Sequence, residues 1–340
     1  MTEPPENQSP ENRPGLNEPG LNEPGLNEPG LLRLATLLRD AGHAFVTPTP
    51  ATHARVNARP ANAWARDARD VFGWSRPFRE GLLAPALFDA MRDAGVLVPH
   101  ADASGAPAWR SAVRLSSLGG LLLLHSAYPT GAADSVFLGP DTYRYAAALD
   151  AWIAARAAPV RRACDIGSGS GAGAILVARA FPEAEVWAAD INPAALLLTR
   201  VNAALAGVTV HAVHSDLLSA VPSGLDLACA NPPYLADPGE RAYRHGGGPL
   251  GAALSLRIVD EAPPRLSPGG SMLLYTGVAI VSGSDPFQAA AASQLQARND
   301  VTWTYREMDP DVFGEELEHD PYGAADRIAA VVLTATRNGT

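Results

Sequence analysis

The chain contains no lysine, so all 26 of its basic residues are arginines, and 36 acidic residues give it a formal net charge of −10. An acidic chain without a basic tract is poorly suited to duplex nucleic acid, because that partner needs cations that neutralise phosphates. A local arginine patch is compatible with a negative total. The charge therefore argues against nucleic acid without excluding it. The missing lysine, in a chain rich in Ala, Arg, Gly and Pro, is also what a codon bias produces.

Long apolar runs are also missing. No stretch approaches the roughly 18 uninterrupted apolar residues of a membrane span, so we expect none. Three glutamates fall within the first eleven residues, where a secretory signal would carry a basic segment and then an apolar one, so we expect no signal peptide. The only two cysteines, Cys164 and Cys229, lie in predicted central strands. Buried free cysteines are typical of a reducing compartment, and we expect a cytoplasmic protein.

Residues 14–30 repeat the pentapeptide Pro-Gly-Leu-Asn-Glu. Five residues are too few for a solenoid unit, and the Pro-Gly pair in each repeat argues against a helix or a sheet ladder. We therefore expect residues 1–30 to form a disordered tail, with order beginning at Leu31. The remaining length is enough for two domains.

Residues 31–135 predict a small N-terminal module. Apolar residues recur at helical spacing after Leu31, and residues 61–72 and 82–94 predict two further helices, the last of them stopped by Gly95. Residues 108–115 and 120–127 predict two strands. Three helices followed by a two-stranded wing indicate a helical, winged-helix-like domain, which either recognises a substrate or partner or only shapes a neighbouring groove.

From residue 136 to residue 340 the pattern alternates strands with helices, which predicts an α/β fold with a doubly wound, mainly parallel sheet of seven strands. The final two strands are expected to form an antiparallel hairpin. The predicted strands are residues 161–165, 185–189, 208–213, 225–230, 271–275, 301–306 and 326–336, and the predicted helices are residues 143–157, 174–180, 193–206 and 287–298.

A glycine-rich turn follows the first of these strands. Asp165 lies at the strand end, and residues 167–173 read Gly-Ser-Gly-Ser-Gly-Ala-Gly before the next helix. Glycines allow positive φ and let a ligand approach the main chain, so the turn predicts a nucleotide-like ligand. The spacing alone also fits a nicotinamide dinucleotide, with Asp190 on its ribose. Asp165 favours a methionine amino group instead, because a carboxylate repels a pyrophosphate.

A second motif, Asn231-Pro232-Pro233-Tyr234, follows the strand at residues 225–230. With the glycine turn, it resembles the class I S-adenosylmethionine-dependent methyltransferases, and within them the HemK/PrmC-like ("methyltransferase small") group that acts on planar amide or amino nitrogens. The resemblance covers about residues 136–336. It implies a Rossmann-like methyltransferase sheet, S-adenosyl-L-methionine as cofactor, and methyl transfer to nitrogen.

The segment at residues 136–143 resembles the one that lies over the cofactor in that group, although Asp141 or Thr142 fits equally well as the N-cap of the next helix. Asp190 is expected to accept both ribose hydroxyls, and Asp216 stands where the resembled group contacts adenine. The expected cofactor-binding residues are Thr142, Asp165, Gly167, Ser168, Gly169, Gly171, Asp190, Ile191, Asn192, Asp216, Leu217 and Asn231.

The expected catalytic residues are Asn231, Pro232, Pro233 and Tyr234. If the side-chain carbonyl of Asn231 and the main-chain carbonyl of Pro232 each accept one N–H, the acceptor nitrogen is aimed at the methyl group and its developing charge is stabilised. Tyr234 is expected to stack on the planar acceptor. His211 and His214 point to opposite faces of a strand, so no metal site is expected.

The methyl acceptor stays open at this level. The usual helical substrate domain of the release-factor enzymes is not evident, and residues 274–277 lack the acidic residue that those enzymes carry after the fifth strand. Protein glutamine N5, with a translation factor among the candidates, is the first hypothesis; adenine N6 or guanine N2 of RNA or DNA is the second. A binding module without turnover is the third, against which the intact Asn231–Tyr234 motif argues. The negative charge favours a protein acceptor.

Two further segments carry expectations. Residues 245–248, His-Gly-Gly-Gly, predict a surface loop or a flexible lid over the acceptor. The acidic cluster at residues 315–320 predicts a solvated hairpin loop.

Overall fold

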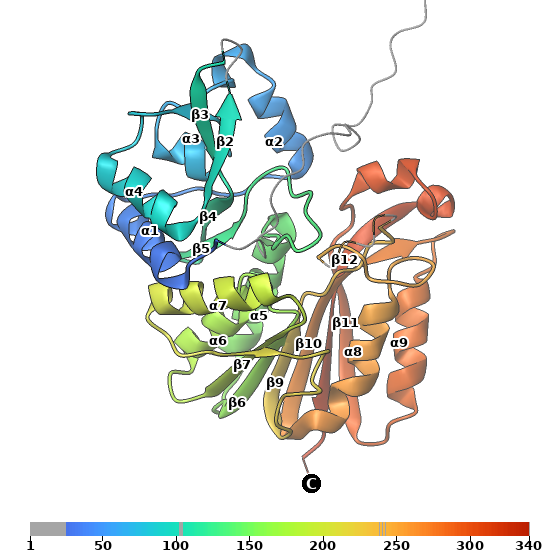
Figure 1. The fold of residues 1–340 in the computed structure, drawn as a ribbon. Helices are drawn as coiled ribbons and strands as arrows, with labels where there is room; N and C mark the ends of the chain where they lie inside the picture. The colour runs from blue at the N-terminus through green and yellow to red at the C-terminus, as the bar shows by residue number, and fades with distance from the viewer. Residues whose placement is uncertain (1–24, 102–104, 238, 240, 242, 340) are drawn as a thin grey trace, which may run out of the picture.

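The computed structural model describes residues 25–101, 105–237, 239, 241 and 243–339. The sheet domain forms the lower part of the molecule in Figure 1, and the N-terminal module lies above it. Residues 1–24, most of the expected disordered tail, lie outside the described residues. Within the described residues, no helix is long and apolar enough to cross a membrane.

The sheet domain contains one seven-stranded sheet in the order β11-β12-β10-β9-β6-β7-β8. Strands β6 to β10 run parallel, and β12 is antiparallel to both β10 and β11. The doubly wound α/β fold and its C-terminal antiparallel hairpin are thus confirmed. The strands are β6 (Arg162–Ile166), β7 (Glu185–Asp190), β8 (His211–His214), β9 (Leu225–Ala230), β10 (Leu266–Ile280), β11 (Val301–Asp309) and β12 (Arg327–Arg337).

Helices cover both faces of this sheet (Figure 1). One face carries α5 (Pro140–Ala155), α6 (Ala172–Ala180) and α7 (Pro193–Ala206), and the other carries α8 (Ala253–Glu261) and α9 (Pro286–Gln296). The bounds of α7 are those predicted, because its ends carry strong signals. Asn192 caps the first turn by accepting from the Ala194 N–H at 3.0 Å, and Gly207 ends the helix with φ of 70°.

Strand β10 has 15 residues, three times the length of the strand predicted over residues 271–275. It starts at Leu266, and its residues 271–280 pair without interruption with β12. Residues 272–280 are all buried, since helices cover both faces of the sheet there. Thr276 and Gly277, expected to follow the strand, therefore lie inside it with residues 274 and 275. Helix α8 was not predicted, and the third strand is shortened to β8.

The N-terminal module contains four helices and five strands among the described residues. The strand order β1-β3-β2 beside the helices fits a winged-helix-like arrangement. The expected position of the wing was wrong, because the wing-like hairpin is β2–β3, whereas β4–β5 is a separate hairpin. The elements are α1 (Glu28–Asp40), α2 (Pro50–Asn57), α3 (Ala68–Phe72), β1 (Phe78–Arg79), α4 (Pro85–Ala94), β2 (Leu97–Ala101), β3 (Pro107–Ser111), β4 (Val113–Leu118) and β5 (Leu121–Ser126).

Two local expectations in the module were wrong. The helix expected over residues 61–72 is split, because Pro60 starts a 3-10 turn and Asp67 caps a new helix, α3. Order does not begin at Leu31, since α1 starts at Glu28. A Cβ on Gly30 would lie 2.7 Å from the Cα of Ala94 in α4, so this glycine belongs to a tight helix contact.

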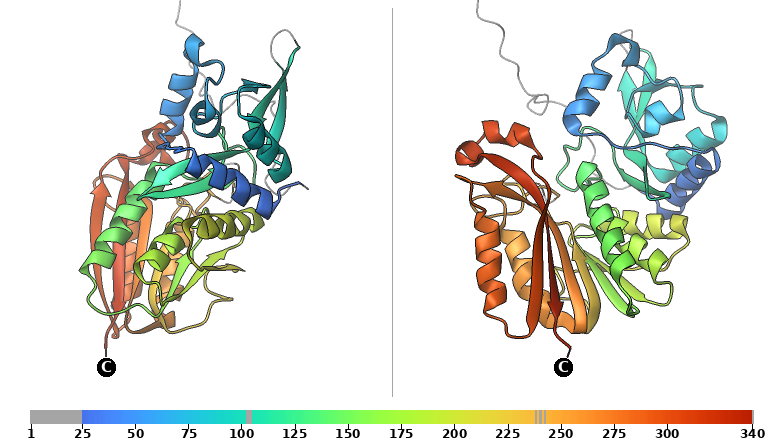
Figure 2. Two further views of the ribbon diagram at one scale, coloured as in Figure 1. Left: turned by 90° about the vertical axis from the view of Figure 1, so that its left-hand side faces the viewer. Right: turned by 180° about the vertical axis from the view of Figure 1, so that it is seen from behind.

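The module packs directly on helix α7 of the sheet domain. Figure 2 shows α1 lying along α7, and both helices contribute to one apolar core with Leu31, Leu34, Leu198 and Val201. The division between the domains at residue 135 stays a prediction, because this core includes residues from both sides of it.

Candidate active site

A cavity of about 200 Å³ lies at the carboxyl ends of β6, β7 and β9, where ligands bind in doubly wound sheets. Pro50 of the module closes one side. Most expected site residues reach its wall: Thr142, Gly167, Gly169, Asp190, Ile191, Asn192, Asp216, Leu217 and residues 231–234.

The glycine turn leaves open space in front of its backbone. Gly167 and Gly169 have φ of 67° and 53°, and a Cβ on either would meet no protein atom within 4 Å. Gly171 has a different role, because a Cβ there would lie 3.0 Å from the side chain of Thr199 in α7. The first two glycines therefore leave a hollow, the glycine cradle, at the cavity wall, and the third allows α6 to pack on α7.

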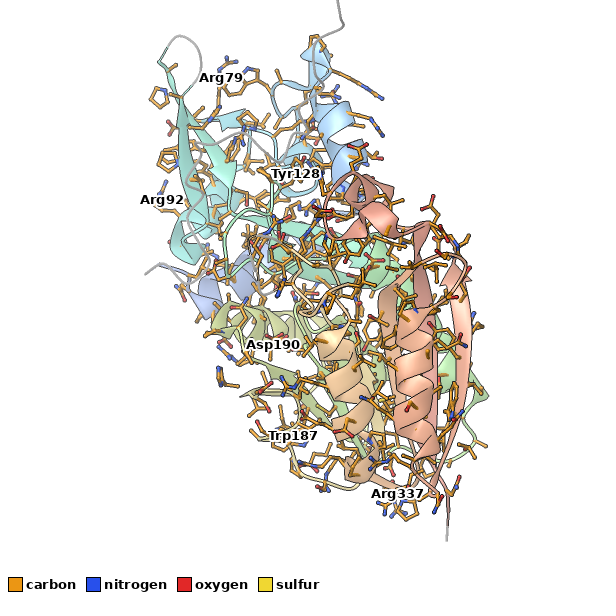
Figure 3. The ribbon with its side chains drawn as sticks, turned by 90° about the vertical axis from the view of Figure 1, so that its right-hand side faces the viewer. Arg79, Arg92, Tyr128, Trp187, Asp190 and Arg337 are labelled. Carbon is orange, nitrogen blue, oxygen red and sulfur yellow. The ribbon has the colours of Figure 1, made fainter. Side chains whose placement is uncertain are left out.

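Asp190, the last residue of β7, holds the turn in place. Its Oδ2 accepts from the Gly169 N–H at 2.9 Å, and its Oδ1 accepts from the Asn192 N–H at 2.8 Å. Burial raises the pKa of Asp190, and these main-chain hydrogen bonds oppose the rise. Each carboxylate oxygen has two lone pairs, so both can still accept from a ligand. Figure 3 shows Asp190 in the sheet domain, below the module that contains Tyr128.

The structure does not bring Asp165, Ser168 or Gly171 to the cavity wall. The Asp165 carboxylate is buried and accepts from the Tyr145 hydroxyl at 2.8 Å and from the Ala174 N–H at 2.9 Å. Burial raises the pKa of Asp165 to about 7. Its observed contacts fix the start of α6 against α5.

The Asn231–Tyr234 loop presents two unused polar groups. Asn231 is half-buried on the cavity wall, and its amide forms no hydrogen bond with any residue that the structure describes. The main-chain carbonyl of Pro232 accepts none from those residues either. Buried polar groups are normally satisfied within the protein, so this pair is available to a ligand.

Tyr234 is only 6% exposed. Its ring packs on Gly277 of β10 and meets the ring of Phe313 edge-on at 5.9 Å. Its hydroxyl is buried near Asp141 and lacks a hydrogen-bond partner among the described residues. Burial, with the Asp141 charge as a smaller cause, raises the pKa of Tyr234. Little of the ring is left for stacking on an acceptor.

Residues 245–248 brace this loop. The Gly246 N–H donates to the carbonyl of Leu235 at 2.8 Å, and Leu235 in turn donates to the carbonyl of Arg244 at 3.0 Å. A Cβ on Gly246 would overlap the Gly251 carbonyl oxygen. Gly246 is therefore needed for close backbone packing, which does not support a free lid.

Asp141 is not a helix cap, since Gly139 occupies the N-cap of α5 and the Thr142 hydroxyl accepts from the Gly139 N–H at 3.3 Å. The Asp141 carboxylate accepts from the Tyr275 hydroxyl at 2.7 Å at the base of the cavity. Burial raises the pKa of Asp141. Tyr275 was missed by sequence reasoning because it lies inside a strand that no polar motif marks.

The acidic cluster after β11 is not uniformly solvated. Glu316 is buried and forms an ion pair with Arg244, which lines the cavity. Phe313 also lines the cavity. The sequence carried no signal for this contact, because the two charged residues are 72 positions apart.

An apolar side chain is left uncovered beside the polar groups. Ile191 is a large apolar residue on the cavity wall, and yet 55% of its surface is exposed. Asp216 is exposed and pairs with Arg257 at 3.1 Å. The described residues contain no group of three or more His, Cys, Asp or Glu side chains that could hold a metal ion.

Residues 153–279 match the model of the methyltransferase small domain. A release factor glutamine methyltransferase of Deinococcus radiodurans is 40% identical over 126 residues, which are 33% of this chain and 44% of the relative. The corresponding enzyme of Bordetella pertussis is 37% identical over 172 residues, 46% of this chain and 60% of the relative.

A ribosomal protein uL3 glutamine methyltransferase of Bordetella pertussis is 36% identical over 144 residues, 38% of this chain and 47% of the relative. The chain thus spans about half the length of the curated relatives it matches. A solved methyltransferase from Pyrococcus furiosus aligns with 66% of this chain and 92% of its own at 18% identity and a TM-score of 0.43. Residues 153–279 are thus similar to the methyltransferase small domain and to the release factor glutamine methyltransferases, which supports the HemK/PrmC-like resemblance.

Proposed function

We propose that the chain transfers a methyl group from S-adenosylmethionine to a planar amide nitrogen, and that the acceptor is the side chain of a protein glutamine. The observation that carries the proposal is the unused Asn231 amide and Pro232 carbonyl beside the glycine cradle. S-adenosylmethionine would supply an electrophilic methyl group on a sulfonium.

The cavity fits this cofactor in three respects. Gly167 and Gly169 leave room for a ligand against the backbone. Asp190 keeps lone pairs that suit two ribose hydroxyls. The uncovered side chain of Ile191 offers an apolar surface to a flat base, where burial would gain free energy.

The chemical task of the protein is to orient a weak nucleophile. An amide nitrogen has its lone pair delocalised into the carbonyl, so it attacks poorly. Hydrogen bonds from its two N–H groups to the Asn231 side-chain oxygen and the Pro232 carbonyl would hold it toward the methyl group. The same acceptors would stabilise positive charge as it develops on nitrogen. Pro232 and Pro233 restrict the backbone that carries them.

The choice of a protein acceptor rests on the relatives and on charge. The relatives are glutamine methyltransferases of a release factor and of ribosomal protein uL3, so a translation component in the cytoplasm is the proposed partner. A net charge of −10 without lysine disfavours a polyanionic acceptor. The nucleobase alternative keeps the same Asn231 chemistry.

The test uses the purified full-length chain, S-adenosylmethionine with a tritiated methyl group, and fractionated extract of the source organism. We expect label that protease releases, and N5-methylglutamine in the enzymatic digest by mass spectrometry. Label released only by nuclease would replace the protein acceptor with a nucleobase. Cofactor binding without transfer to any fraction would indicate a binding module.

A further inference from the structure

A second cavity, of about 40 Å³, lies in the N-terminal module and is named here the Arg110 cavity. Among the residues that the structure describes, Arg110 is its only charged lining residue, and none of them lines it with an acidic side chain. Ser135 lines both this cavity and the larger one. The Arg110 cavity therefore adjoins the candidate active site.

Three serine hydroxyls that line the Arg110 cavity keep a proton to donate, whereas the Ser111 hydroxyl donates to the Val113 carbonyl at 2.7 Å. Ser75 Oγ accepts from the Tyr128 N–H at 3.0 Å, and Ser126 Oγ accepts from the Val136 N–H at 2.8 Å. Neither of these hydroxyls donates to a described residue, so each keeps its O–H for a ligand. The Ser135 hydroxyl forms no hydrogen bond with the described residues. The side chains offer mainly donors, which suits an anion.

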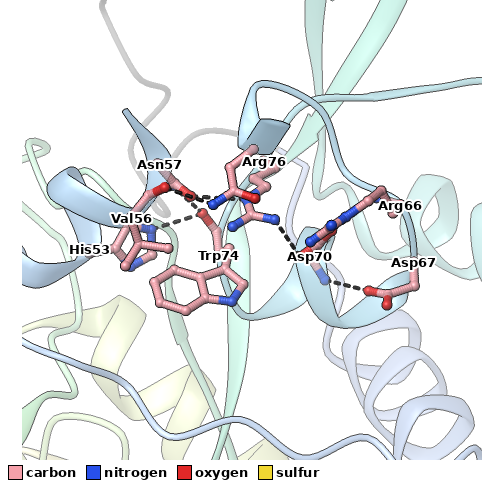
Figure 4. Close-up of polar contacts among 9 residues, drawn as sticks. His53, Val56, Asn57, Arg66, Asp67, Asp70, Trp74 and Arg76 are labelled. Carbon is pink, nitrogen blue, oxygen red and sulfur yellow. Dashed lines mark hydrogen bonds and ion pairs between the residues drawn. The ribbon is translucent and has the colours of Figure 1, made fainter. Parts of the chain in front are cut away.

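The Arg110 side chain forms no hydrogen bond, ion pair or ring contact with the part of the chain that the structure describes, and its Nε is buried. A buried N–H without an acceptor is unfavourable, so this Nε–H favours the binding of an acceptor group. Arg76, another arginine of the module, has partners for its side chain. Its buried guanidinium pairs with Asp70 at 2.6 Å and donates to Asn57 at 3.0 Å (Figure 4). Arg110 thus has unused capacity that Arg76 lacks.

Arg114 adds a second positive charge near the cavity. It is 2% exposed and donates from Nε to the carbonyl of Ser126 at 3.1 Å. No carboxylate of the described residues forms an ion pair with it. Burial lowers the pKa of Arg114 to about 10, so it stays charged at neutral pH. An anion in the Arg110 cavity would be attracted by both guanidinium groups.

We propose that the Arg110 cavity binds a carboxylate of the methyl acceptor, supplied by an aspartate or glutamate near the methylated residue. This inference rests on the proposed function. A glutamine bound in the larger cavity would bring the residues next to it in the acceptor chain close to Ser135, which lines both cavities. The planar guanidinium fork matches a carboxylate, and the cavity is of the size of such a group. The acceptor is thereby a glutamine flanked by an acidic residue.

The experiment uses a peptide library with one fixed glutamine, in which each flanking position carries either Asp or its neutral isostere Asn. Tritiated S-adenosylmethionine gives kcat/KM for each peptide. At one position we expect Asp to exceed Asn by about tenfold or more, as for a charge-assisted hydrogen bond. Arg110→Gln should abolish this preference and leave kcat/KM for the Asn peptide within about twofold.

Two variants control for charge and folding. Arg92→Gln makes the same charge change on the outer side of the module, away from Tyr128 (Figure 3), and should keep the preference for Asp. Arg110→Lys keeps the charge without the fork and should retain part of it. Methylation without a preference for Asp, or a preference that Arg110→Gln leaves unchanged, overturns the inference while the proposed function stands.

A binding measurement covers the case in which no peptide is methylated. Fluorescein-labelled Asp and Asn pools are titrated with the protein in the presence of S-adenosylhomocysteine, and anisotropy is read. Tighter binding of the Asp pool that Arg110→Gln removes supports the carboxylate site, even if the chemistry differs. Equal binding of the two pools overturns it. Two further outcomes would overturn an acceptor subsite. The first is a cavity that holds only water. The second is that sodium acetate raises the melting temperature of the wild type but not of Arg110→Gln, while the peptides show no preference for Asp.

Discussion

At the scale of single residues, the candidate active site contains two kinds of polar side chain. Some form hydrogen bonds within the protein, and others form none with the described residues. Each carboxylate oxygen of Asp190 accepts from a main-chain N–H, and the carboxylate of Asp165, which is buried away from the cavity wall, accepts from Tyr145 and Ala174. Asn231 has no such internal partner. A residue with a structural partner is expected to affect folding when it is changed, and a residue without one is expected to affect turnover.

The first prediction applies this to Asn231→Ala. We expect methyl transfer to fall about a hundredfold in single-turnover assays, because one acceptor for the developing charge is lost. Cofactor affinity by calorimetry should stay within a few fold of the wild type. Asn299→Ala, at an exposed position, is the matched control. A normal transfer rate in Asn231→Ala would remove this residue from the catalytic machinery.

Asp165 gives a prediction about pH. Its folded pKa of about 7 lies above the ordinary value of 3.8, so the folded chain holds this proton more tightly than the unfolded chain. The resulting stability is fully present below about pH 4 and is lost as pH rises through about 7. Between pH 4 and pH 8 the wild type should lose up to about 4 kcal/mol relative to Asp165→Asn, at 1.36 kcal/mol per pKa unit. Urea unfolding at each pH measures this, and parallel pH curves for the two proteins would contradict it.

At the scale of elements, the sequence predicted best where local signals and burial agree. Helix α7 has a proline in its first turn, a capping asparagine and a terminal glycine, and its bounds are those expected. Strands β6, β7 and β9 are short, mainly apolar runs with a polar residue or a glycine at or next to their carboxyl ends, so these ends, and with them most of the site, were predictable.

Contacts distant in sequence could not be predicted in this way. The tripled length of β10 depends on its pairing with β12 over residues 271–280. The separation of β4–β5 from the sheet of β1, β3 and β2 involves a contact distant in sequence, the packing of β5 on α7. Tyr275 and Glu316 reach the site only through such contacts, and neither belongs to a motif.

The prediction for β10 concerns Gly277. A Cβ at this position would overlap the Tyr234 ring, which Phe313 covers on another side. Gly277→Ala should therefore displace the Asn231–Tyr234 loop, lower turnover at least about tenfold and cost about 1–3 kcal/mol of stability, as overpacking does. Gly131→Ala adds the same methyl group in open space and is the control. Wild-type turnover in Gly277→Ala would show that the ring position is not needed.

The first turn of α1 gives a prediction by truncation. The Asn27 N–H donates to the Ala94 carbonyl at 3.3 Å, and Glu28 pairs with Arg200 of α7 at 2.9 Å. A chain lacking residues 1–30 should melt several degrees below a chain lacking residues 1–24, because only the first loses these contacts and the Gly30 packing. Equal melting temperatures by calorimetry would show that the α1 start contributes nothing.

At the scale of the whole molecule, the module and the sheet domain share one core around α7, and a fully buried polar side chain lies at that junction. Asn202 of α7 is fully buried. Its Oδ1 accepts from the Leu124 N–H of β5 at 2.7 Å, and its Nδ2 donates to the carbonyls of Leu124 at 2.9 Å and Ser170 at 2.8 Å. Asn202 thereby joins the β4–β5 hairpin of the module to the glycine turn. The same hairpin carries Ser126, which lines the Arg110 cavity.

The prediction at this scale is for Asn202→Ala. Leaving the Leu124 and Ser170 main-chain groups buried without partners should cost about 2–4 kcal/mol in urea unfolding, since each unsatisfied group costs about 1–3 kcal/mol. Because the lost bonds hold both parts, affinity for S-adenosylmethionine and kcat/KM for the acceptor should weaken together. Asn27→Ala removes one exposed hydrogen bond to Asp93 and serves as the control. A variant that lost stability but kept both binding functions would show that the module and the cradle are positioned independently, and that the shared core alone fixes their arrangement.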